Sequence, residues 1–99
     1  MRLEIHFEAR AEFLEAVSFY EARVPGLGLR FIAEIERCQQ TLLDTPLIGS
    51  PYGRRLRKFT VGDKFPYSIV YAVLADGLYI VAYAHGSRRP GYWRARSPR

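Results

Sequence analysis

The sequence has little cysteine, little histidine and no long apolar run. Cys38 is its single cysteine, which excludes an internal disulfide and any metal site built from several cysteines. Neither His6 nor His85 has a cysteine or carboxylate at the spacing typical of metal ligands, so we expect no metal and no cofactor. No stretch approaches the roughly eighteen apolar residues of a membrane span, and residues 1–10 contain no signal-peptide core. We therefore expect a cytoplasmic protein without membrane contact.

Signatures of covalent catalysis are missing too. No serine pairs with a histidine in a recognisable nucleophile elbow, and no glycine-rich loop follows a predicted strand. Cys38 falls on an apolar helical stripe, so we interpret it as a core residue and not as a nucleophile. The chain has 99 residues, 48% of them hydrophobic, which predicts one domain over 1–99 with its own core.

Charge is distributed unevenly along the chain. Residues 1–45 hold five Arg against eight Asp and Glu, whereas residues 46–99 hold ten Arg and Lys against two Asp, a net charge of +8. Thirteen of the fifteen basic residues are Arg, whose planar guanidinium fits phosphate or carboxylate. Two interpretations remain open here: a basic surface that keeps the protein soluble, or a surface for nucleic acid or an acidic protein segment.

The first half of the sequence predicts a strand and two helices. Alternation of apolar and polar residues over 3–7 is typical of a half-buried strand. Apolar residues spaced by three and four then predict a helix that ends near Val24, because a proline and Gly26 follow. A second apolar stripe, with steps of four, four, three and four, predicts a helix over 27–44.

The second half of the sequence predicts strands. Prolines and glycines make 46–53 a loop. A strand over 54–60 follows, with a bulge or an early end expected because its apolar residues change parity. Residues 65–74 are apolar on both parities, as in a central strand, and a turn at 75–77 leads to a last strand over 78–85.

This order predicts an α+β fold, β-α-α-β-β-β. We expect an N-terminal strand and an antiparallel helical hairpin packed on one face of an antiparallel sheet, with positive charge on the other face and the tail. The predicted core comprises Phe13, Val17, Tyr20, Phe31, Ile35, Leu42, Ile69, Tyr71, Val73, Ile80 and Ala82.

Two basic clusters are candidate binding sites. Residues 54–58 hold four cations; on a strand, Arg55 and Arg57 would point to one face and Arg54 and Lys58 to the other. Residues 85–94 interleave cations with rings, a mixture that can hold phosphates while the rings stack on bases. The same residues can equally anchor the tail, with the ring of a tryptophan packed and the arginines solvated.

Four segments carry a family resemblance. Residues 65–71 resemble the FPYxIxY strand of RelE/ParE toxins, and residues 84–96 resemble the closing HxxRxPxYWxxR motif of the same superfamily. Residues 13–20 and 25–31 are similar to the helix end and the "PGLG..F" helix start of its members. In order along the chain they span residues 13–96, so the match extends over nearly the whole chain, and the sequence is identified as a member of this superfamily.

The resemblance implies a toxin of a type II toxin–antitoxin, or plasmid stabilisation, system, neutralised by an acidic antitoxin encoded beside it. RelE-like members are enzymes that cut messenger RNA in the ribosomal A site. ParE-like members inhibit DNA gyrase and are not enzymes. The long helical hairpin and the FPY strand favour the ParE-like branch, with a RelE-like endoribonuclease and a non-toxic nucleic-acid-binding relative as alternatives.

The resemblance also implies site residues. Counterparts of the nuclease residues, should the chain cut RNA, are Arg57, Lys58, Arg88, Arg89, Tyr92 and His85. Candidate residues for binding the target or nucleic acid are Arg54, Arg57, Lys58, Arg88, Arg89, Tyr92, Trp93, Arg94 and Arg96. Because strand 54–60 and strand 78–85 flank the same central strand in a meander, we expect the tail to fold back over one sheet face, beside Arg57 or Lys58.

Overall fold

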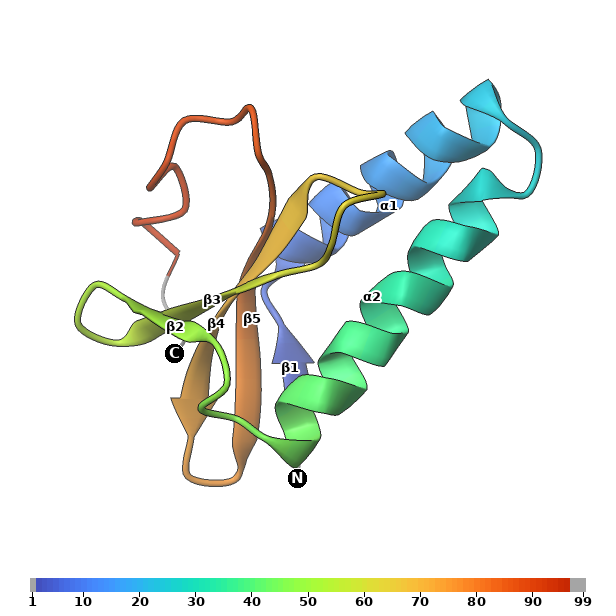
Figure 1. The fold of residues 1–99 in the computed structure, drawn as a ribbon. Coiled ribbons are helices and arrows are strands. Elements are labelled where there is room, and N and C mark those ends of the chain that lie inside the picture. The colour runs from blue at the N-terminus through green and yellow to red at the C-terminus, as the bar shows by residue number, and fades with distance from the viewer. Residues whose placement is uncertain (1, 97–99) are drawn as a thin grey trace.

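The computed structural model describes residues 2–96, in which a helical hairpin covers one face of a five-stranded sheet (Figure 1). The elements are β1 (Arg2–Ile5), α1 (Phe7–Arg23), α2 (Leu27–Asp44), β2 (Ser50–Tyr52), β3 (Leu56–Thr60), β4 (Tyr67–Leu74) and β5 (Gly77–His85). The strand order is β1-β5-β4-β3-β2. In Figure 1 the helices lie to the right of the sheet, and the chain after β5 lies to the left of it.

The turn between α1 and α2 is defined by residues close to it in the sequence. α1 ends where Val24 adopts extended backbone before a proline, and Gly26 then takes a left-handed φ of 88°. The Glu21 carboxylate accepts hydrogen bonds from the backbone N–H groups of Gly26 (2.8 Å) and Gly28 (3.0 Å), two donors at the start of α2. A Cβ at Gly28 would lie 2.9 Å from the Val17 carbonyl oxygen, so glycine lets the helices approach closely.

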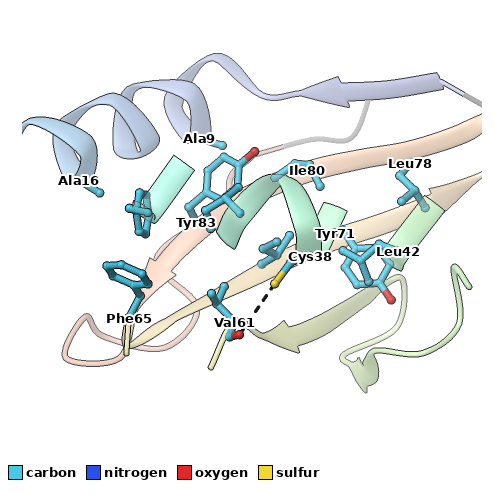
Figure 2. Close-up of a cluster of buried hydrophobic side chains, with 13 residues drawn as sticks. Ala9, Ala16, Cys38, Leu42, Val61, Phe65, Tyr71, Leu78, Ile80 and Tyr83 are labelled. Carbon is cyan, nitrogen blue, oxygen red and sulfur yellow. Dashed lines mark hydrogen bonds between the residues drawn. The ribbon is translucent and has the colours of Figure 1, made fainter. Parts of the chain in front are cut away.

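The main core lies between the helices and the sheet, as Figure 2 shows. Of the predicted core, Phe13, Val17 and Tyr20 are partly buried against it, and Phe31, Ile35, Leu42, Ile69, Tyr71 and Ile80 are buried in it. Cys38 is fully buried there, with Sγ 3.8 Å from the Val61 carbonyl oxygen (Figure 2). Burial raises the pKa of the Cys38 thiol, which keeps it protonated and unreactive, as expected for a core cysteine.

A bulge in β5 creates a second buried cluster on the opposite face of the sheet. Val70 pairs with Ala82 while Tyr71 pairs with Ile80, which leaves Val81 as an extra residue on β5. Val81 and Ala82, although consecutive, therefore both belong to the cluster that faces away from the helices.

The predicted α+β fold is confirmed, with three corrections. β1 pairs with β5 in parallel, so the sheet is mixed and not wholly antiparallel. The predicted loop 46–53 contains the short edge strand β2, whose partner is β3. The strand predicted over 54–60 begins only at Leu56, which places Arg54 and Arg55 in the β2–β3 turn, and the bulge expected there lies in β5 instead.

One predicted core residue is exposed. Val73 is 39% accessible and lies beyond the part of β4, Ser68 to Tyr71, that pairs with β3. No helix within residues 2–96 has the length and apolar character needed to cross a bilayer.

Candidate functional site

The C-terminal segment, residues 86–96 (hereafter the tail), folds back across the sheet face opposite the helices (Figure 1). It is a series of turns: the N–H groups of Arg94 and Arg96 donate to the carbonyls of Gly91 and Trp93, respectively, at 3.1 and 2.9 Å. Trp93 is only 4% exposed and packs into the second cluster, against the strands. The tryptophan therefore anchors the tail and holds the neighbouring cations in place.

Arg96 provides a second anchor. Its guanidinium donates to Glu12 Oε2 at 2.9 Å and to the Val81 carbonyl, which the β5 bulge presents, at 3.0 Å. The other oxygen of Glu12 accepts from the Tyr83 backbone N–H at 3.0 Å, so one carboxylate joins α1, β5 and the tail. The Arg96 side chain is 9% exposed, which leaves most of its charge engaged within the protein.

Tyr92 lies between two guanidinium groups. The Cζ atoms of Arg88 and Arg96 are 3.9 and 5.2 Å from the centre of its ring. Its hydroxyl is buried beside the Glu12 carboxylate but forms no hydrogen bond of ordinary geometry with the described residues, and burial, followed by the interaction with Glu12, raises its pKa. Tyr92 is therefore poorly placed to donate a proton to a bound substrate.

Arg57 and Lys58 point to opposite faces of the sheet, because neighbouring residues of β3 alternate. On the helix-side face, Arg57 donates to the carbonyls of Gly49 (2.6 Å) and Leu47 (3.2 Å) and so ties the α2–β2 loop to β3. On the tail-side face, Lys58 Nζ lies 5.5 Å from the centre of the Tyr52 ring. Of these two cations, Lys58 is the one on the sheet face that the tail covers.

A cleft opens between the tail and the β2–β3 turn. The rings of Tyr52 and Trp93, 5.5 Å apart between centroids, form its apolar wall, and its volume is about 690 Å³. We name it the tail cleft; its lining residues are Tyr52, Gly53, Arg54, Arg55, Leu56, Trp93, Arg94 and Arg96. Of the cations, Arg54, Arg55 and Arg94 are exposed, and none of the three pairs with a carboxylate within residues 2–96.

His85 and Arg88 lie elsewhere. Both line a smaller pocket of about 200 Å³ between α1 and the sheet, together with Glu15 and Tyr67. His85 Nδ1 accepts a hydrogen bond from the Ser87 N–H at 3.0 Å, which leaves the neutral ring with its proton on Nε2. This histidine is thus turned away from the tail cleft.

The structure brings together only part of the predicted site. The tail cleft brings together Arg54, Trp93, Arg94 and Arg96, with Lys58 beside Tyr52. Neither Arg57 nor His85 lines the tail cleft. Arg89 is exposed in a turn of the tail.

Sequence reasoning missed three residues of this region. Arg55 belongs to a basic cluster that the sequence revealed, but strand parity placed it on a sheet face, whereas it lies in the β2–β3 turn. Tyr52 lies in what was predicted as a loop, and nothing local marks Glu12 as the partner of the tail. The resulting cleft can bind phosphates or carboxylates beside an aromatic wall. Among the described residues, no three His, Cys, Asp or Glu side chains are grouped to hold a metal ion.

The chain matches the model of one protein family over most of its length. The family model described as the ParE toxin of type II toxin–antitoxin systems, parDE, matches residues 3–90. The match includes both helices and the strands and ends within the tail, so Trp93, Arg94 and Arg96 lie beyond it. A search of curated proteins found no relative that matches the sequence.

Proposed function

The chain belongs to the ParE toxin family of type II toxin–antitoxin systems, and from this premise we propose that it arrests growth in the cytoplasm by binding DNA gyrase through the tail cleft. ParE toxins pair with a cognate antitoxin, so a neutralising partner is part of the same system. Gyrase bound to DNA is a nucleoprotein assembly, and the unpaired arginines of the cleft suit its anionic surface.

The buried hydroxyl of Tyr92 is the observation that supports this proposal most. RNA cleavage needs a base for the 2′-hydroxyl, cations at the phosphate and an acid for the leaving oxygen, all within hydrogen-bonding distance of one substrate. Here Tyr92 is enclosed between two guanidinium groups, and His85 lies in a different pocket. Arg57 is on the opposite sheet face. The arrangement offers a surface for binding and lacks a converging acid and base.

A pair of assays on purified protein tests the proposal. We expect the toxin to inhibit supercoiling by purified gyrase and to leave messenger RNA intact on translating ribosomes. Messenger cleavage with unaffected supercoiling would favour the RelE-like endoribonuclease instead. Inactivity in both assays, with a folded protein, would support a non-toxic family member.

The tail cleft also suits an acidic segment of the antitoxin, which would then compete with the target. Residues 46–99 carry a net charge of +8, and opposite charge on a partner accelerates association more than it strengthens binding. We expect the association rate to fall as salt is raised, because ions screen charges beyond a Debye length of about 10 Å at 0.1 M. An association rate that is indifferent to ionic strength would contradict electrostatic steering.

A further inference from the structure

A second hollow lies on the helical side of the molecule, on the opposite side of the sheet from the tail cleft. It has a volume of about 560 Å³ and runs between one face of α2 and the segment that joins β3 to β4. Tyr20, Leu27 and Phe65 form its apolar floor. We name this hollow the hairpin groove.

Cations line the rim of the hairpin groove. They are Arg30 and Arg37 from α2 and Lys64 from the β3–β4 segment. Arg37 is paired with Glu34, with Nη2 and Oε2 2.5 Å apart. Arg30 and Lys64 are exposed and form no ion pair within residues 2–96. The groove thus combines an apolar floor with two exposed cations that form no ion pair within the described residues, and Lys64 lies near enough to Glu34 to help lower the pKa of that carboxyl, after Arg37.

We propose that the hairpin groove receives a segment of the cognate antitoxin in which an apolar side chain is flanked by carboxylates. The apolar side chain would fill the space over Phe65, and the carboxylates would meet Arg30 and Lys64. This proposal takes from the proposed function only the existence of the antitoxin, and it is independent of the toxin's target.

Two matched arginines test the charge of the occupant. Arg30 and Arg10 are each the fourth residue of a helix, both are exposed, and only Arg30 lines the groove. Glutamate in a first helical turn is compatible with the helix dipole, so neither Arg30→Glu nor Arg10→Glu should unfold the protein. We expect Arg30→Glu to weaken calorimetric binding of the purified antitoxin about tenfold or more, and Arg10→Glu to leave it unchanged. Equal affinities of the two variants would overturn the proposal.

Ala33 provides a second, size-matched test inside the groove. It is exposed on α2, where glutamate and lysine are both good helix formers of similar length. We expect Ala33→Glu to weaken antitoxin binding and Ala33→Lys to preserve it. If both substitutions weaken antitoxin binding equally, the size of the new side chain and not its charge decides the affinity, which overturns the proposal. Loss of toxin self-association in Ala33→Glu, with antitoxin affinity intact, would assign the groove to a second copy and overturn it as well.

Growth assays separate this proposal from the proposed function. In cells that lack the antitoxin, Arg30→Glu should arrest growth as the unaltered chain does, because the groove lies apart from the tail cleft. In cells that also make the antitoxin, Arg30→Glu should remain toxic. A chain that fails to arrest growth at all would contradict the proposed function, whereas the calorimetric affinities would still decide the proposal about the groove.

Discussion

Arg96 and Glu12, 84 positions apart in the sequence, form an ion pair of 2.9 Å that fastens the tail to α1. Their side chains are 9% and 13% exposed, so each charge depends on the other for compensation. The pair of Arg2 and Asp76, at 3.1 Å, joins side chains that are more than half exposed. Arg2 also pairs with Glu4, and Arg96 also donates to the Val81 carbonyl, so each arginine has a second partner and the two differ most in burial.

Arg96→Ala should destabilise the protein. It leaves the Glu12 carboxylate largely buried without its cation and frees the end of the tail, which should cost about 2–3 kcal/mol of the free energy of unfolding. In a domain of this size, thermal unfolding followed by circular dichroism should then show a fall in Tm of roughly 10 °C or more. Arg2→Ala, the control, should change the stability by at most about 0.5 kcal/mol. Similar losses in both variants would contradict the structural role of Arg96.

Arg57 and Lys58, neighbours in β3, should respond in opposite ways to alanine. Arg57→Ala removes the donor that binds the Gly49 and Leu47 carbonyls and should lower the free energy of unfolding by about 1–2 kcal/mol. Lys58→Ala removes an exposed cation over Tyr52 and should leave stability nearly unchanged while weakening growth arrest. Denaturant unfolding and a growth assay on both variants check this. Full toxicity of Lys58→Ala would exclude it from the target surface.

Arg88 and Arg89 belong to the tail but do not line the tail cleft, so the double variant Arg88→Ala with Arg89→Ala tests whether the target surface extends beyond the cleft. We expect the double variant to abolish growth arrest in a folded protein. Both side chains are exposed, and the Arg88 guanidinium lies over the Tyr92 ring, with Cζ 3.9 Å from the ring centre. Losing this contact should cost at most about 1 kcal/mol, so Tm should change little. The measurement is growth after induction beside a melting curve of the purified variant. Persistent arrest by the folded double variant would remove these arginines from the functional surface.

Local patterns in the sequence predicted the elements well, because helices and strands bury their apolar residues with fixed periods. The stripe from Leu27 to Leu42 and the Pro25-Gly26 turn correspond directly to α2 and its start. Alternation along a strand predicted the wrong position for a side chain wherever the strand contains an extra residue or begins later than expected. The extra residue Val81 shifts the register of β5, and the late start of β3 at Leu56 takes the arginines before it off the sheet.

The candidate site was harder to predict, because its assembly depends on contacts between distant segments. Composition revealed the cations and rings of the tail, and the meander correctly placed the tail over a sheet face. Nothing local indicates that Arg96 and Arg57 engage partners inside the protein, since those partners are Glu12 and two loop carbonyls. A cation that holds the fold together and one that binds a target look alike in a sequence.

Two tyrosines should respond in opposite ways to the same change. The Tyr71 hydroxyl accepts from the Gly49 N–H at 3.0 Å and donates to the Pro46 carbonyl at 2.7 Å. Tyr71→Phe leaves the buried Gly49 N–H without this acceptor and should cost about 1–3 kcal/mol of the free energy of unfolding. The Tyr92 hydroxyl is buried beside Glu12 without a hydrogen bond of ordinary geometry among the described residues, so Tyr92→Phe removes a polar group that burial penalises.

Tyr92→Phe should therefore match or slightly exceed the unaltered chain in stability, and it should keep full toxicity if the tail cleft works as a binding surface. An RNA-cleaving toxin that used this hydroxyl to transfer a proton would lose roughly a hundredfold or more of its rate with the phenylalanine. Denaturant titrations of both variants and growth arrest by Tyr92→Phe are the measurements. Loss of growth arrest in a Tyr92→Phe protein of unchanged stability would contradict the binding mechanism and would return Tyr92 to a catalytic role.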